Sequence, residues 1–201
     1  MSWKRVENMS EALILVDIQN DFCPGGALAV LDGDAVVPVL NRYLERAAAR
    51  GLAIYASRDW HPARTAHFKA FGGTWPPHCI QGTPGAELHP DLRLPSGVEI
   101  VSKGMSEREE GYSMLDGLLP DGRPLLEALR AAGVTRVFVG GLATDYCVRA
   151  TVLDALAAGL ETRLLTDASR AVDVRPGDGE RATHEMLAAG ARPITLDQFS
   201  A

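Results

Sequence analysis

Short apolar segments alternate with helical segments along almost the whole chain, and this alternation restricts the fold more than any other feature of the sequence. Each apolar segment is rich in valine, isoleucine and leucine, which is typical of a strand buried on both faces of a parallel sheet. The segments that we expect to form strands span residues 13–18, 52–57, 98–101, 134–139 and 162–165, with a last short strand around Ile194.

Segments with helical patterning lie between these strands. They span residues 35–50, 124–132, 147–158 and 179–189. A glycine directly follows each segment, at the position where an α-helix commonly ends in a left-handed residue: Gly51, Gly133, Gly159 and Gly190. The repeated order of strand, helix and glycine predicts a three-layer α/β fold. Because 201 residues are few for two domains, we expect a single domain over residues 1–201.

The overall composition argues against several classes of partner. The chain has 20 basic and 26 acidic residues and a net charge of −6, which disfavours nucleic-acid binding. No apolar run approaches the roughly 18 residues of a membrane span, and the N-terminal residues lack the apolar core of an export signal. Cys23, Cys79 and Cys147 are too few and too scattered for a disulfide framework. We therefore expect a soluble, cytoplasmic protein with free thiols that does not bind membranes.

One long segment, residues 59–97, interrupts the alternation. It is rich in proline and glycine, carries four of the five histidines and follows a predicted strand, so we interpret it as a loop that builds a ligand site. Asp59 and His61 can point the same way because side chains alternate along an extended chain, and His67 and His78 follow them. These ligands suit a zinc, iron or manganese ion. The alternative reading, histidines at the surface or in core hydrogen bonds, is common for any single histidine.

A second motif ends at Cys147. The predicted strand 134–139 is followed by the turn Gly140–Gly141 and by a helix expected to open at Cys147, which is the layout of a nucleophile elbow. At the start of a helix the dipole favours a thiolate, and free backbone N–H groups can hold an oxyanion. The alternative is a small buried cysteine that serves only in packing. The chain contains neither G-x-G-x-x-G nor a Walker-type motif, so a nucleotide-phosphate site lacks support.

Two charged residues end predicted strands. Asp17 closes the first apolar run and Lys103 closes the third. A carboxylate at the end of a buried strand is costly unless it has a partner or a task. We expect Asp17, Lys103 and Cys147 to meet at one edge of the sheet. Taken singly, Asp17 could cap a turn and Lys103 could be a solvated surface residue.

Taken together, these motifs resemble the nicotinamidases (pyrazinamidases) of the isochorismatase-like cysteine hydrolases. The resemblance runs from about residue 13 to about residue 167. Its motifs are Asp17, Lys103 and Cys147; Asp59, His61, His67 and the Trp75–Cys79 stretch; Asp21–Gly26; Gln81–Gly85; and Gly141–Cys147. It implies an isochorismatase-like fold with a six-stranded parallel sheet between helices, in agreement with the strands expected above.

The resemblance also implies an activity, which is the hydrolysis of nicotinamide, and of pyrazinamide, through a thioester on Cys147. Asp17 would accept and return the protons, and Lys103 would keep Asp17 ionised and favour the thiolate. The backbone N–H groups of Ala143 and Cys147 would hold the oxyanion, with a cis peptide between Leu142 and Ala143.

For the substrate, the resemblance implies one divalent metal ion that binds the pyridine nitrogen and orients the ring. The metal ligands would be Asp59, His61, His67 and His78. The substrate would also contact Phe22, Trp75, Tyr112 and Ala143, although Tyr112 could equally be an ordinary core aromatic residue.

The sequence also allows other functions. The chain could hydrolyse a different small amide or a carbamoyl group, as other members of the superfamily do. It could be a metal-binding scaffold without catalysis, but this reading leaves Asp17, Lys103 and Cys147 unexplained. An isochorismatase activity is less favoured because vinyl-ether chemistry does not need a cysteine. The sequence does not identify the metal, does not decide whether the chain forms a homo-oligomer, and assigns no role to Cys23 and Cys79.

Overall fold

Six parallel strands form one sheet in the computed structural model, which describes residues 10–199. Their order across the sheet is β3-β2-β1-β4-β5-β6. The strands are β1 (Ser10–Val16), β2 (Ala53–Asp59), β3 (Glu99–Lys103), β4 (Val134–Leu142), β5 (Glu161–Arg170) and β6 (Arg192–Ile194). The six-stranded parallel sheet expected from the sequence is therefore confirmed.

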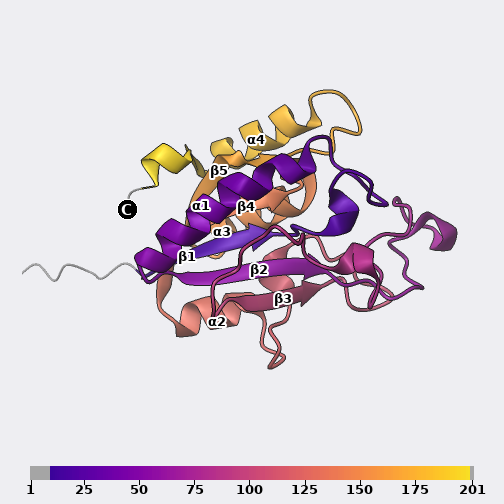
Figure 1. Ribbon diagram of the computed structural model, residues 1–201, viewed down its shortest axis with the longest axis horizontal. Coiled ribbons are helices and arrows are strands. Elements are labelled where there is room, and N and C mark those ends of the chain that lie inside the picture. The colour runs from indigo at the N-terminus through magenta and orange to yellow at the C-terminus, as the bar shows by residue number, and fades with distance from the viewer. Residues whose placement is uncertain (1–9, 200–201) are drawn as a thin grey trace, which may run out of the picture.

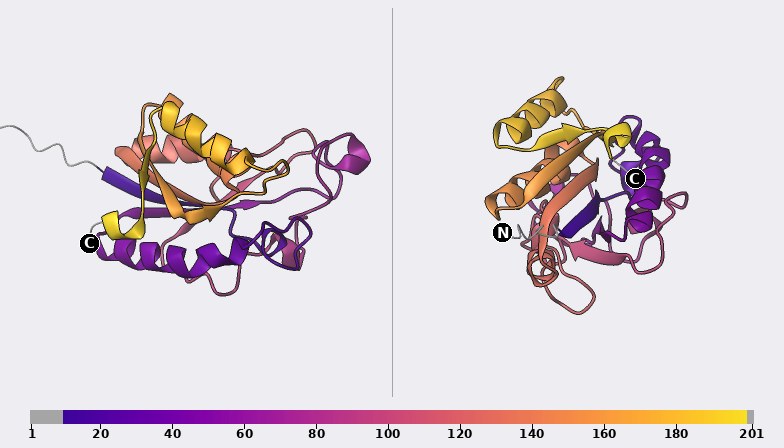
Figure 2. Two further views of the ribbon diagram at one scale, coloured as in Figure 1. Left: turned by 90° about the horizontal axis from the view of Figure 1, so that it is seen from above. Right: turned by 90° about the vertical axis from the view of Figure 1, so that its left-hand side faces the viewer.

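Helices cover both faces of this sheet and complete three layers, as Figure 1 and Figure 2 show. The helices are α1 (Val36–Ala49), α2 (Leu125–Ala131), α3 (Arg149–Ala157) and α4 (Asp178–Ala188). On one face, Leu13 and Leu15 of β1 belong to the same apolar cluster as the buried side chains of α1. On the other face, Ala12 and Ile14 belong to a cluster that includes residues of α2, α3 and α4. A strand buried on both faces explains why its sequence is almost continuously apolar.

The strand order reverses at β1, which lies between β2 and β4. In an open α/β sheet, the crevice at the carboxyl ends of the strands beside such a reversal is the usual place for a ligand. The register brings the relevant strand ends together, since Val16 lies opposite Gly141 and Asp59 lies opposite Lys103. The sheet therefore collects at one edge the residues that follow or end β1, β2, β3 and β4.

Several predicted strand boundaries were wrong, since β1 begins at Ser10, β3 ends at Lys103 and β4 ends at Leu142. β1 ends at Val16 rather than at residue 18, because Asp17 has a left-handed backbone conformation (φ +50°) that takes the chain out of the sheet. β2 continues to Asp59, so this residue lies within the strand and not after it. β5 continues to Arg170, past polar residues that end the apolar run and past a register shift in its pairing with β4.

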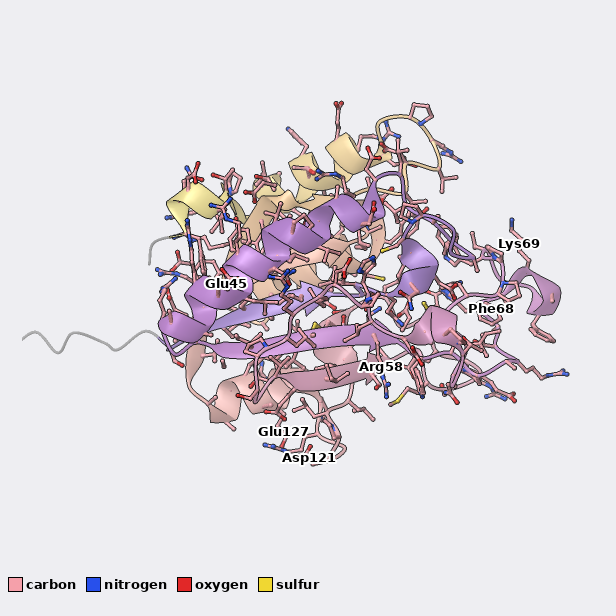
Figure 3. All side chains as sticks on the ribbon, viewed as in Figure 1. Glu45, Arg58, Phe68, Lys69, Asp121 and Glu127 are labelled. Atoms are coloured by element: carbon pink, nitrogen blue, oxygen red, sulfur yellow. The ribbon has the colours of Figure 1, made fainter. Side chains whose placement is uncertain are left out.

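The long segment between β2 and β3 extends beyond the carboxyl ends of these strands. In Figure 3, the labelled Lys69 lies at its outer end. Isolated β-bridges between His61 and Ile80 and between Phe68 and Trp75 fold the segment back on itself. No helix within residues 10–199 is long and apolar enough to cross a membrane. Residues 1–9, on which the expectation of no export signal depends, lie outside the described part of the chain.

Candidate active site

The buried side chain of Lys103 lies at the centre of the predicted site. Its Nζ is 2.7 Å from Oδ2 of Asp17 and 2.5 Å from Oδ1 of Asp59, and it lies 3.4 Å from Sγ of Cys147. It also donates a hydrogen bond to the carbonyl oxygen of Gly111 (2.8 Å). The structure thus brings Asp17, Lys103 and Cys147 together, as the sequence predicted, and joins them to Asp59 of the predicted metal set. The alternative of a solvated surface lysine does not apply, since Lys103 is fully buried.

Each of the three residues is placed by the end of a strand. Asp17 directly follows β1, and Lys103 is the last residue of β3. Cys147 lies in a π-helical turn, Thr144–Val148, that connects β4 to α3. The helix expected to open at Cys147 therefore begins differently, because the turn starts three residues earlier and the regular α-helix starts at Arg149. The peptide bond between Leu142 and Ala143 is cis, which confirms that expectation.

Burial controls the ionisation of Cys147 and its neighbours. Burial raises the pKa of Asp17 to about 6, although the positive charge of Lys103 opposes the shift. Burial also raises the pKa of the Cys147 thiol well above its usual value, again against the effect of Lys103. This contradicts the expectation that position at a helix start is enough to favour the thiolate. The resting group is a thiol, and a base must remove its proton.

The carboxylates of Asp17 and Asp59 compensate the positive charge of the buried Lys103. Burial by itself lowers the pKa of Lys103, but Asp17 and Asp59 outweigh this effect and raise the pKa well above its usual value. Asp59 is affected in the opposite sense, since Lys103 and His61 lower its pKa despite its burial. Asp59 and Lys103 therefore form a buried ion pair in which both groups are charged at neutral pH.

The three predicted histidine ligands converge beside this ion pair. One ring nitrogen from each of His61, His67 and His78 lies within 4.8 Å of the others, and all three side chains are buried. Oδ2 of Asp59, the oxygen turned away from Lys103, is 3.6 Å from Nε2 of His61 and 3.8 Å from Nε2 of His78. Nitrogen and oxygen ligands at these separations form a candidate site for a divalent metal ion.

The surroundings of the histidines fit a metal ion. Nδ1 of His61 is 3.0 Å from the carbonyl oxygen of Gly104, and Nδ1 of His78 is 2.9 Å from that of Pro76. A carbonyl acceptor requires a proton on Nδ1, which leaves the lone pair on Nε2 free for a metal. Nε2 of His61 is indeed buried without a hydrogen-bond partner. Burial also lowers the pKa of His67 to about 4, so this ring is neutral, as a ligand must be.

Aromatic side chains surround the histidines. Phe22 lies against His78, with ring centroids 5.6 Å apart, and Tyr112 lies 5.5 Å from His67. Nε1 of Trp75 donates a 3.0 Å hydrogen bond to the hydroxyl of Tyr112. The structure thus places the three aromatic residues expected to contact substrate beside the histidine cluster, and Ala143, the fourth, lies at the end of β4 next to the nucleophile turn.

Sequence reasoning missed four residues that shape this site. Ser57 bonds to Asp17, Gln19 bonds to the backbone of Asp59 in both directions, and Gly104 packs against the ring of His61. Tyr146 packs edge-on against Trp75 at 4.8 Å. The sequence could have predicted the place of Ser57, because Ser57 precedes Asp59 by two residues and side chains two apart in a strand point to the same face. For the other three, nothing in the sequence indicates the contact.

Two surface cavities lie beside this cluster without reaching its centre. One of about 500 Å³ lies between β5 and α4, and its wall includes Thr144 but neither Cys147 nor any of the four predicted metal ligands. Another, of about 570 Å³, is lined by Tyr146 but again by neither Cys147 nor a predicted metal ligand. The site is therefore identified by the convergence of buried polar groups and not by cavity volume.

The fold and the site together define a class of protein: a hydrolase with a three-layer α/β fold and a buried acid, lysine and cysteine at the switch point of its parallel sheet. Comparison with known families agrees, since the family described as "Isochorismatase domain" matches residues 11–198. The chain belongs to this isochorismatase family.

Individual proteins are similar to this chain over most of its length. It is 42% identical to a nicotinamidase of Escherichia coli (strain K12), with 92% of this chain and 94% of that protein covered. It is 43% identical to a nicotinamidase/pyrazinamidase of Mycobacterium tuberculosis, with 80% and 87% covered. Among solved structures, the pyrazinamidase of Pyrococcus horikoshii in complex with zinc superposes with a TM-score of 0.85 at 45% identity, covering 92% of this chain and 99% of that one.

Proposed function

We propose that this protein hydrolyses nicotinamide to nicotinate and ammonia through a covalent thioester on Cys147. The observation that carries the proposal is the contact of Lys103 with Asp17, Asp59 and Cys147, which joins a nucleophile and a base directly to a metal-ligand cluster. The names of relatives that match most of the chain support the same substrate.

In the first half-reaction, Asp17 accepts the proton of the Cys147 thiol. The sulfur electron pair attacks the carboxamide carbon, and the carbonyl electrons move to oxygen. When the tetrahedral intermediate collapses, the carbon–nitrogen bond breaks and Asp17 returns the proton to the leaving nitrogen, which departs as ammonia. A base with a pKa of about 6 suits both steps, because it is ionised at neutral pH and still gives up a proton readily.

In the second half-reaction, the same carboxylate takes a proton from water. The hydroxide attacks the thioester carbon, the carbon–sulfur bond breaks, and Asp17 reprotonates the sulfur to restore Cys147. Lys103 remains charged throughout and offsets the negative charge that moves between oxygen and sulfur. The sum is amide plus water to acid plus ammonia, so one carboxylate serves both halves.

The oxyanion is assigned to the backbone N–H groups of Ala143 and Cys147. Ala143 directly precedes the turn Thr144–Val148, Cys147 lies within it, and the peptide bond that leads into Ala143 is cis. Loss of one such donor typically costs about a hundredfold in rate or more.

The metal is assigned to Asp59, His61, His67 and His78, with zinc, iron and manganese all compatible with this ligand set. When bound, the ion supplies a Lewis acid that can bind a pyridine nitrogen and fix the ring. The chain's own contribution is orientation, because Phe22, Trp75 and Tyr112 stand around the histidines as walls for a flat ring. Pyrazinamide, whose ring likewise carries a nitrogen meta to the carbon that bears the carboxamide, is proposed as a second substrate.

The free state of Cys23, Cys79 and Cys147 supports a cytoplasmic location, which we also propose. Burial raises the pKa of both Cys23, to about 11, and Cys79, so neither is activated as a second nucleophile. We assign both to packing.

Ammonia release from nicotinamide by the purified protein, with and without added divalent metal, tests the proposal. Cys147→Ala should abolish turnover and leave the bound metal unchanged, because the sulfur belongs to the nucleophile and not to the histidine cluster. Retained turnover in this variant would refute the covalent mechanism. Benzamide, which lacks the ring nitrogen, should be a much poorer substrate than nicotinamide, and equal rates would favour a hydrolase of another small amide. A measurable metal content with no amide hydrolysis and an inert thiol would favour the scaffold alternative.

A further inference from the structure

Ser57 is a buried residue of β2 that holds the proposed base by two hydrogen bonds. Its hydroxyl donates to Oδ1 of Asp17 at 2.7 Å. The hydroxyl oxygen of Ser57 in turn accepts a 3.2 Å hydrogen bond from the backbone N–H of Asp17. Both residues are fully buried, so water does not replace either bond. Ser57 is therefore hydrogen-bonded to both the backbone and the side chain of Asp17.

The two carboxylate oxygens of Asp17 have different neighbours as a result. A serine hydroxyl has only one proton to donate, and in Ser57 this proton is directed at Oδ1. Oδ2 is left on the side of Lys103, whose Nζ lies 2.7 Å from it and 3.4 Å from the sulfur of Cys147. An oxygen of Asp17 and the sulfur lie within 4.8 Å of each other. One oxygen of the carboxylate is thus held by Ser57, and the other lies against the same ammonium group that contacts the sulfur.

We propose that Ser57 is a positioning residue that makes Oδ2 of Asp17 the atom that removes the thiol proton of Cys147. This inference rests on the proposed function of the site. In the step concerned, the S–H bond breaks, an O–H bond forms at Oδ2, and the sulfur keeps the electron pair with which it attacks. Oδ1 carries no proton in this step, because it accepts the hydrogen bond of Ser57.

The left-handed backbone conformation of Asp17 explains why its side chain needs the hydrogen bonds of Ser57 to fix its orientation. Outside the regular sheet, with φ +50°, Asp17 lacks the ladder that orients a side chain in a strand. Lys103 attracts the carboxylate but does not distinguish its two oxygens, because an ammonium group is a point charge with rotating donors. Without the hydroxyl, both oxygens can turn to Lys103, and the carboxylate no longer faces the sulfur in one orientation.

Three variants test the proposal. Ser57→Ala removes the hydroxyl. Ser57→Thr keeps a hydroxyl at this position, and threonine is a residue favoured in strands. Thr162→Val is the matched control, because Thr162 is also a buried strand residue whose hydroxyl makes one hydrogen bond, to the carbonyl oxygen of Leu160, far from the site. Each variant is compared with the parent for kcat and KM on nicotinamide, bound metal and melting temperature. The rate at which iodoacetamide alkylates Cys147, located by peptide mapping, is also measured near neutral pH.

In Ser57→Ala, kcat should fall by about tenfold to a hundredfold, a large part of what general-base catalysis usually contributes, with KM and metal content little changed. Alkylation of Cys147 should slow in parallel, since it needs the same proton removal. Ser57→Thr should restore both rates to within a few-fold of the parent, and Thr162→Val should lower only the melting temperature. If Ser57→Ala does not fold, Ser57→Cys, which keeps the volume but donates a weaker hydrogen bond, takes its place with the same expectations.

Two results would overturn the proposal. One is an unchanged kcat and alkylation rate in Ser57→Ala. The other is a loss of rate that Ser57→Thr does not restore, although that variant folds and retains metal. If the parent does not hydrolyse nicotinamide at all, the proposed function fails, but the alkylation rates of the parent and the variants still decide the role of Ser57.

Discussion

The substitution Gly104→Ala should displace His61, a proposed metal ligand, without removing its side chain. Gly104 directly follows Lys103, has φ +65° and is buried. A Cβ at this position would lie 2.4 Å from Cε1 and 2.6 Å from Nδ1 of His61. Apolar atoms in contact lie about 3.5–4.0 Å apart, so the ring or the backbone must move by about 1 Å. Movement of this size breaks the bond of Nδ1 to the Gly104 carbonyl that orients Nε2.

The expected magnitude has two parts. An alanine in the left-handed region costs about 1–2 kcal/mol, and forcing a methyl group into a packed site costs about 1–3 kcal/mol. The sum of about 2–5 kcal/mol should lower the melting temperature by about 4–20 °C in a chain of this length. Because the orienting bond of a metal-bound histidine is lost, the metal affinity should fall by about tenfold to a hundredfold.

Gly133→Ala supplies the control. Gly133 has almost the same backbone conformation (φ +67°), but a Cβ there would meet no atom within 4 Å. This variant carries only the backbone cost of about 1–2 kcal/mol and should keep its metal. The assay is elemental analysis after dialysis against metal-free buffer, combined with thermal unfolding and ammonia release. The reasoning is refuted if Gly104→Ala retains metal and activity as well as Gly133→Ala does.

Three further predictions follow from other parts of the structure. Removal of metal by a chelator should abolish ammonia release and its return should restore it, whereas full activity in a sample shown to be metal-free would take the ion out of the reaction. Because burial raises the pKa of Asp17 to about 6 and the base acts when ionised, kcat/KM should decrease about tenfold per pH unit as the pH falls below that value, and a flat profile down to about pH 4 would contradict the assignment of Asp17 as the base. Tyr43→Phe removes the 2.8 Å hydrogen bond from the buried Tyr43 to Asp167 and should cost about 1.5–3 kcal/mol in thermal or chemical unfolding with activity unchanged; loss of activity in a fully folded sample would mean that this contact reaches the site.

Much of the fold follows from local patterns that the sequence displays directly. Buried parallel strands require continuous apolar runs, and helices between them end at glycines, so the six strands and the three layers could be predicted. The boundaries could not, because the end of β1 depends on the left-handed conformation of Asp17 and the length of β5 on its pairing with β4. The partner and register of a strand cannot be predicted from the sequence of that strand alone.

The membership of the site could likewise be predicted from residue types and their places at strand ends. Asp59, His61, His67 and His78 lie in one segment, and a metal requires several such ligands close together. The sequence did not show that Lys103 bridges Asp59 and Asp17, since that contact needs the register in which Asp59 lies opposite Lys103 on the neighbouring strand.

The sequence by itself therefore determined the layers, the site edge and the chemical types gathered there. Only the tertiary structure decided the protonation of those groups, because a pKa depends on burial and on the distance to other charges. The Cys147 thiol illustrates the difference: its place at a turn after β4 favours a thiolate, but burial beside two carboxylates keeps it protonated. Likewise, only strand pairing brings Ser57 within 2.7 Å of a carboxylate 40 positions earlier in the chain.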